Sequence, residues 1–147
     1  MAETTTSRLI RAPRAAVYRA VADVETLASC LQPANTSAQI LERDPARGWL
    51  RMAISHAPGP EGTRRFHLTL LEAQPDERVV YGSAFETDDP QLAGEMKLHF
   101  LLAGAPGGTE VTVRHEGVPP AINLADNEAG TASSLANLAR LLERHTA

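Results

Sequence analysis

Cysteine is almost missing from this chain of 147 residues, which contains Cys30 alone. A single cysteine excludes an intramolecular disulfide framework and is typical of a reducing compartment. Long apolar runs are also missing: none approaches the roughly 18 to 20 residues that span a bilayer. The start of the chain, Met1 to Ser7, is polar and does not contain the apolar core of a signal peptide. We therefore expect a cytoplasmic protein that has no membrane partner.

Basic residues are also fewer than acidic residues. The chain has 14 Lys and Arg residues against 18 Asp and Glu residues, which gives a net charge of −4. Nucleic acids require a concentrated basic patch, so we expect no nucleic-acid partner. Lys97 is the only lysine, and this preference for arginine together with abundant alanine suggests a bacterial, GC-rich genome. Aromatic residues make up only 4% of a composition that is otherwise typical of a globular domain, and no repeat divides the chain. We expect residues 1–147 to form a single domain.

The first part of the chain predicts one strand and two short helices. Residues 4–12 alternate weakly and end at Pro13, which suits the first turn of a helix because it has no backbone N–H. In the segment Arg14 to Ala22, apolar residues recur at a spacing of four, as they do on one face of a helix. Asp23 can cap a second short helix, which Pro33 then closes.

The middle of the chain predicts six strands joined by short turns. Apolar and polar residues alternate there, and a period of two places the apolar side chains on one face of a sheet. The clearest case has Met96, Leu98 and Phe100 in phase with one another and Lys97 and His99 out of phase. Consecutive short strands with short turns predict an antiparallel meander. The predicted strands are 37–43, 49–56, 64–73, 79–86, 95–102 and 110–116.

The last part of the chain changes to a helical period. Asn123 is suited to cap a helix in which Leu135, Leu138 and Leu142 recur every three to four residues up to His145. This pattern predicts an amphipathic helix of about 20 residues, roughly 30 Å long. One face of the antiparallel sheet must be covered, and only this helix is long enough. We therefore predict an α+β fold in which a curved antiparallel sheet wraps around the long C-terminal helix. The two short helices then close one end.

Several segments in their order resemble a known family. They are Ile10 to Pro13, Pro75 to Tyr81, Val111 to Gly117, Asn127 to Gly130 and Ser134 to Leu138. Their order and spacing resemble the START and birch-pollen-allergen superfamily (SRPBCC). Within it, they are similar to single-domain bacterial members of the family named for the activator of heat-shock-protein-ninety ATPase. The resemblance covers nearly the whole chain and implies the helix-grip fold.

The resemblance also implies a hydrophobic cavity between the sheet and the C-terminal helix. We expect a small-molecule or lipid-like ligand-binding protein that uses no cofactor. Two other functions stay open. One is a cyclase, hydrolase or dehydratase using the same cavity, as in polyketide-cyclase-like relatives, and the other is a chaperone-ATPase regulator acting by protein interaction. A homodimer formed through a sheet edge or the short helices is compatible with this fold.

The residues expected to line the cavity come from the apolar faces of the predicted elements. Apolar walls would supply affinity, while His115, Tyr81 or His56 would orient the ligand. His56 and His115 are in phase with apolar neighbours, so each is a polar anchor in an apolar pocket, a general base tuned by burial, or a hydrogen-bonded structural histidine. The expected ligand-binding residues are Cys30, Met52, His56, Phe66, Tyr81, Phe85, Met96, His115, Thr131 and Leu135.

Two of these positions depart from the family pattern. Relatives commonly carry one Trp where this chain has Cys30 and another where it has Thr131, directly after the helix glycine. Both positions would face the space between sheet and helix. The cavity is therefore either wider or differently shaped than in relatives, or refilled by neighbouring side chains. We interpret Cys30 as a small apolar filler and not as a nucleophile.

The histidines show no metal-binding spacing. The sequence contains no HExxH, no zinc-type His/Cys pair and no EF-hand loop, so we expect no metal site. His99 is out of phase with its apolar neighbours and is expected to face solvent. Asn127 and Glu128 begin the last helix near the end of the strand that carries His115. A carboxylate there would either polarise a ligand or complement the helix dipole.

Overall fold

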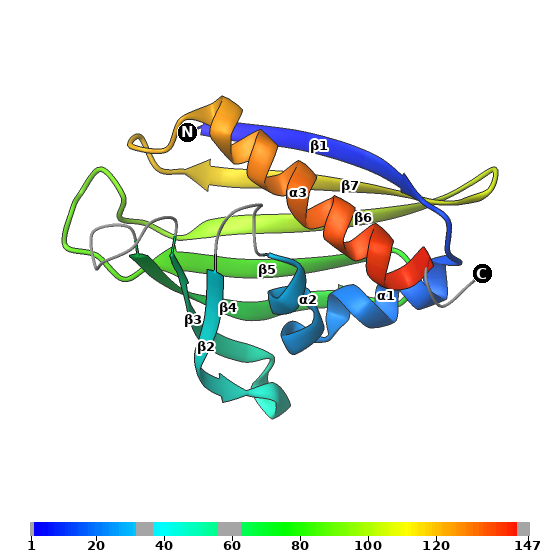
Figure 1. Cartoon of the computed structure of the whole chain (residues 1–147), viewed down its shortest axis with the longest axis horizontal. Helices are drawn as coiled ribbons and strands as arrows, with labels where there is room; N and C mark the ends of the chain where they lie inside the picture. The colour runs from blue at the N-terminus through cyan, green and yellow to red at the C-terminus, as the bar shows by residue number, and fades with distance from the viewer. Residues whose placement is uncertain (1, 32–36, 56–62, 144–147) are drawn as a thin grey trace.

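The structure is a computed structural model that describes residues 2–31, 37–55 and 63–143. Seven strands form one antiparallel sheet in the order β1-β7-β6-β5-β4-β3-β2. In the described part of the chain, three α-helices lie on one side of this sheet, and α3 crosses it diagonally (Figure 1). The elements are β1 (Ala2–Ile10), α1 (Arg14–Ala22), α2 (Val24–Cys30), β2 (Ser37–Asp44), η1 (Pro45–Arg47), β3 (Trp49–Ser55), β4 (Thr63–Gln74), β5 (Arg78–Phe85), β6 (Met96–Ala105), β7 (Gly108–Val118) and α3 (Leu124–Glu143).

The predicted α+β helix-grip arrangement is confirmed, with its strand, two helices, six strands and long helix. Helix α1 has the predicted bounds, whereas β1 ends at Ile10, before the predicted end at residue 12. The chain turns there, since Ala12 N–H donates to the Ile10 carbonyl at 2.9 Å. His56 and His145, which the predicted elements included, lie outside the described residues. None of the described helices is both long enough and apolar enough to cross a membrane.

Side-chain caps explain where two of the helices begin. Asp23 accepts a hydrogen bond from Glu25 N–H at 3.2 Å and another from the Thr26 hydroxyl at 2.9 Å, at the start of α2. Asn123 accepts from Asp126 N–H at 3.1 Å, at the start of α3. Each cap satisfies a backbone donor that has no partner inside the helix.

The sheet curves around the helices, and irregular pairing contributes to this curvature. The register shifts between Ile40 and Glu42 and between Leu70 and Glu72, as β-bulges do. The turn from β2 into β3 requires glycine at position 48, where φ is +64°. A Cβ on Gly48 would also stand only 2.6 Å from Cβ of Leu70.

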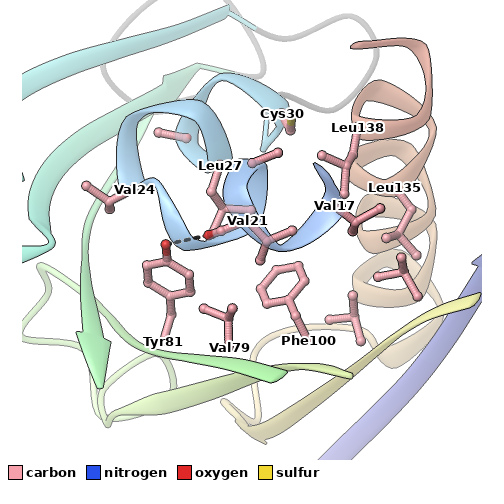
Figure 2. Close-up of a cluster of buried hydrophobic side chains, with 14 of the residues drawn as sticks. Val17, Val21, Val24, Leu27, Cys30, Val79, Tyr81, Phe100, Leu135 and Leu138 are labelled. Carbon is pink, nitrogen blue, oxygen red and sulfur yellow. Dashed lines mark hydrogen bonds between the residues drawn. The ribbon is translucent and has the colours of Figure 1, made fainter. Parts of the chain in front are cut away.

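One end of the space between sheet and helices is a filled core. Tyr81 and Phe100 project from β5 and β6 towards α1 and α2 (Figure 2), with their ring centroids 6.2 Å apart at 85°. The Tyr81 hydroxyl donates to the Val21 carbonyl at 2.6 Å. Leu135 and Leu138 of α3 close this core and are almost completely buried. The short helices therefore act as the predicted plug at this end.

The outer face of the sheet carries a polar cluster on β6 and β7. His99 pairs with Glu116, which also accepts from Arg114 at 2.8 Å. The side chain of His99 is only 14% exposed. The ring of His99 lies on the outer face, as expected from its phase. The expectation that it faces solvent is wrong, because Arg114 and Glu116 cover most of the ring.

Candidate functional site

The other end of the space, under the N-terminal half of α3, contains a pocket of about 590 Å³ that is partly open to solvent, and we call this pocket the cavity. This volume lies within the range of about 300 to 1,000 Å³ that is usual for small-molecule sites. The inner faces of β3 to β7 form its floor and α3 forms its roof. The lining residues are Leu31, Ile54, Arg64, Phe66, Leu68, Ser83, Phe85, Met96, Leu98, His115, Ala121, Ile122, Asn123, Asp126, Asn127, Gly130, Thr131 and Ser134.

One face of α3 changes character along its length. Gly130, Thr131 and Ser134 line the cavity, whereas Leu135 and Leu138 fill the core. These positions follow the spacing of three and four residues that keeps side chains on one helix face. A Cβ added at Gly130 would meet no atom within 4 Å. Small side chains on the first half of the helix therefore leave the space that large ones fill on the second half.

A buried histidine stands in the cavity wall, held by residues from two other elements. His115 on β7 is 9% exposed. Thr4 on β1 donates from its hydroxyl to Oδ1 of Asn127 at 2.5 Å. This bond turns the amide so that Asn127 Nδ2 faces His115 Nδ1 at 3.0 Å. An amide nitrogen only donates, so Nδ1 accepts and the proton of the neutral ring resides on Nε2.

The other ring nitrogen of His115 faces a weak partner. Nε2 lies 3.3 Å from Sδ of Met96, on the neighbouring strand. A thioether sulfur is a poor hydrogen-bond acceptor. Burial lowers the pKa of His115 below its ordinary value of 6.5, so the ring is neutral at neutral pH. The arrangement therefore presents a neutral N–H donor beside the cavity.

The charged side chains of the described lining residues are Arg64 and Asp126, and both are exposed. The guanidinium carbon of Arg64 lies 5.6 Å from the ring centroid of Phe85, in a cation–π contact. Phe85 in turn packs edge-to-face on Phe66, with centroids 6.1 Å apart. One charge of each sign stands at the solvent side, and the walls behind them are mostly apolar.

Five of the residues expected from the sequence line this cavity together. They are Phe66, Phe85, Met96, His115 and Thr131, which come from four strands and α3. Their convergence follows from the antiparallel register, which pairs Phe66 with Phe85 and places consecutive inward-facing residues on neighbouring strands. His56, the other expected histidine, lies outside the described residues.

The remaining expected residues lie elsewhere. Met52 and Tyr81 are buried in the core and do not line the cavity. Tyr81 was expected to orient a ligand, but its hydroxyl is already bonded to the Val21 carbonyl, and burial raises its pKa. Cys30 and Leu135 line a separate cavity of only about 30 Å³, which Thr131 also borders.

The structure is consistent with a packing role for Cys30. Its side chain is buried, and burial raises the pKa of the thiol, which disfavours the thiolate that a nucleophile needs. The small cavity beside Cys30 and Thr131 means that neighbouring side chains do not completely refill the space at these two positions.

Sequence reasoning missed several lining residues, although some had a signal. Leu98 is in phase with Met96, and Ser83 is in phase with Phe85, so strand alternation alone could have added both. Thr4 had no such signal, since its bond to Asn127 joins residues 123 positions apart. Glu128, considered as a carboxylate that polarises a ligand, is exposed and does not line the cavity, whereas its neighbour Asn127 lines it and contacts His115.

Comparisons with known proteins agree with this architecture. The model of the family described as activator of Hsp90 ATPase homolog 1-like protein (AHSA1) matches residues 11–143. A crystal structure of a protein from Chromobacterium violaceum is 31% identical, with a TM-score of 0.80 over 96% of this chain and 97% of that chain.

More distant solved structures share the fold. The AHSA1 protein from Silicibacter pomeroyi is 18% identical and has a TM-score of 0.77 over 98% of this chain and 99% of that chain. No curated protein shows significant sequence similarity to the chain. Since the family model spans nearly all of the sequence, the chain belongs to the activator of Hsp90 ATPase homolog 1-like family.

Proposed function

We propose that this protein binds an apolar small molecule in the cavity between the sheet and the N-terminal half of α3. The observation that carries the proposal is the cavity itself, whose volume of about 590 Å³ suits a small ligand. Its walls are mostly apolar, and one buried histidine supplies a directed polar contact. Apolar walls with a few placed polar groups are the usual composition of a ligand site.

The orientation of His115 supports binding more than general-base catalysis. A general base needs a free lone pair directed at the reacting proton. In this structure Nδ1 accepts from Asn127, and Nε2 carries the hydrogen that faces Met96. The ring nitrogen without a strong partner, Nε2, is therefore a donor, which suits recognition of a ligand oxygen.

Native mass spectrometry of the freshly purified protein tests the proposal, with the denatured protein as its control. We expect a non-covalent adduct that disappears on denaturation and whose mass identifies the ligand class. Thermal unfolding with a panel of apolar compounds provides a second measurement, because a ligand that binds only the folded state raises the midpoint. A clean apo mass and no shift with any compound would contradict the proposal. Regulation of a chaperone ATPase, suggested by the family description, would then be the function to test.

A matched pair of variants shows whether the cavity holds the ligand. Thr131→Trp places an indole in the cavity, whereas Ala132→Trp places the same group at the next, exposed position of α3. We expect the first variant to lose the adduct and the thermal shift, and the second to retain both. Ser134→Leu is a second cavity-filling change if Thr131→Trp does not fold. Equal ligand binding by all three variants would place the ligand elsewhere.

A further inference from the structure

The polar groups around the cavity are not equivalent as ligand contacts. The Thr131 hydroxyl donates to the Asn127 carbonyl at 3.0 Å, and the Ser134 hydroxyl donates to the Gly130 carbonyl at 3.1 Å. Both hydrogens are therefore used inside α3, as hydroxyls in helices often are. These two side chains offer lone pairs to the cavity and no hydrogen.

His115 differs from these hydroxyls because its N–H group makes only a weak hydrogen bond inside the protein. The Thr4 and Asn127 side chains direct the hydrogen to Nε2, and there it meets the Met96 sulfur at 3.3 Å. Oxygen is a much better acceptor than a thioether. A ligand that brings an oxygen to this point would gain a stronger hydrogen bond than the one that Nε2–H makes with the Met96 sulfur.

The charges of the described lining residues favour an ion of neither sign. Arg64 and Asp126 are the charged lining residues in the described part of the chain, and their charges are opposite. Both are exposed, while His115 is buried and neutral. A carboxylate or ammonium beside His115 would lose its hydration, while the charges of Arg64 and Asp126 lie at exposed positions where solvent screens them. The inner wall therefore suits a neutral ligand.

We propose that the ligand is a neutral, largely apolar molecule with a carbonyl-type oxygen, and that Nε2–H of His115 donates to this oxygen in place of the Met96 sulfur. This inference rests on the proposed function. Thr4 and Asn127 are positioning residues, because they act on the ligand only through the His115 ring. A site built around a hydrogen bond discriminates against an analogue that cannot form it.

The tautomer of His115 provides the first test, and it requires no ligand. Nitrogen-15 NMR of the wild-type protein at neutral pH should show the hydrogen on Nε2. Thr4→Val removes the hydroxyl that orients the Asn127 amide, and should raise the population of the Nδ1–H tautomer. A wild-type ring with its hydrogen on Nδ1 would overturn the inference, since Nε2, the nitrogen beside the Met96 sulfur, would then be an acceptor.

Pairs of compounds that differ only in the carbonyl provide the second test. The probes are cyclododecanone against cyclododecane and fluorenone against fluorene, with Kd measured by titration. We expect the ketone of at least one pair to bind about tenfold more tightly than its hydrocarbon, as one net hydrogen bond predicts. His115→Phe should bring the ketone to the affinity of its hydrocarbon and leave the hydrocarbon unchanged.

A second histidine variant serves as the matched control, and the outcomes separate the two proposals. His99→Phe makes the same substitution on the outer face of the neighbouring strand, and should keep the preference for the ketone. Equal binding of ketone and hydrocarbon to the wild type would overturn this inference and leave the proposed function in place. Binding of neither member of either pair, together with a clean apo mass, would contradict both. A native adduct whose composition contains no oxygen would overturn this inference alone.

Discussion

The two ends of the space under the helices use the same strands but differ in packing. On β5, Tyr81 belongs to the filled core, while Ser83 and Phe85, farther along the same face, line the cavity. On β6, Phe100 is in the core and Met96 lines the cavity. The strands therefore supply large side chains at both ends, and they do not explain why only one end is hollow.

The helices explain the difference. Helices α1 and α2 cover Tyr81 and Phe100 (Figure 2), so that end is closed by two extra elements. The hollow end is covered by the first half of α3, which presents Gly130, Thr131 and Ser134 to the cavity. Core and cavity in this fold thus depend on the two short helices that close one end and on the side-chain volume along α3. Four changes would break or sharpen this comparison.

Truncating the filled end should have the largest effect. Phe100→Ala removes an almost fully buried ring that packs edge-to-face on Tyr81. The expected loss of unfolding free energy is about 3 to 5 kcal/mol, because the lost burial and the new cavity both destabilise. Urea denaturation measures it. A loss below about 1 kcal/mol would mean that this end is not as well packed as the structure shows.

Removing the buried hydroxyl at the same end should cost less. Tyr81→Phe keeps the ring but leaves the Val21 carbonyl of α1 without its 2.6 Å partner. An unsatisfied buried acceptor costs about 1 to 3 kcal/mol. Denaturation of the variant should show this loss, with ligand binding retained. If a folded Tyr81→Phe protein lost ligand binding, the packing of the core would affect the cavity, and the separation of the two ends would be contradicted.

Acidification should destabilise the folded protein because His115, in the wall of the cavity, is buried in its neutral form. The pKa of His115 is lowered by burial, so the unfolded chain binds its proton at a higher pH than the folded one. This contribution to stability is complete above about pH 6.5 and declines below it, by at most about 1.4 kcal/mol per pH unit. The decline should be smaller in His115→Phe. The measurement is the unfolding free energy of the wild type and of His115→Phe as a function of pH. Equal declines in the two proteins below pH 7 would contradict the attribution of this pH dependence to His115.

Filling the hollow end slightly should have the smallest effect, with the opposite sign. Gly130→Ala adds a methyl group where no atom stands within 4 Å. Alanine in a helix interior is more stable than glycine by roughly 0.5 to 1 kcal/mol. Thermal unfolding should show a slightly raised midpoint. Gly48→Ala is the contrasting variant, and should destabilise because of its φ of +64° and the 2.6 Å approach to Leu70.

Local patterns predicted the elements and much of the cavity floor. Asp23 and Asn123 cap the helices that their positions indicated, and Phe66, Phe85, Met96 and His115 share the inner face as strand alternation implied. These features depend on residues close in the chain, so caps and periods of two or 3.6 are enough to predict them.

Contacts between residues far apart in the chain could not be predicted from local patterns and became visible only in the tertiary structure. Tyr81 and Phe85 have the same phase on one strand, yet one is in the core and the other lines the cavity, because distant helices decide what covers each. The Thr4–Asn127 bond spans 123 positions and selects the hydrogen-bearing nitrogen of His115. Composition and periodicity thus determined which residues face inward. Only the packing of α1, α2 and α3 on the sheet decided which of them fill the core and which leave space, because packing depends on volumes that meet across the fold.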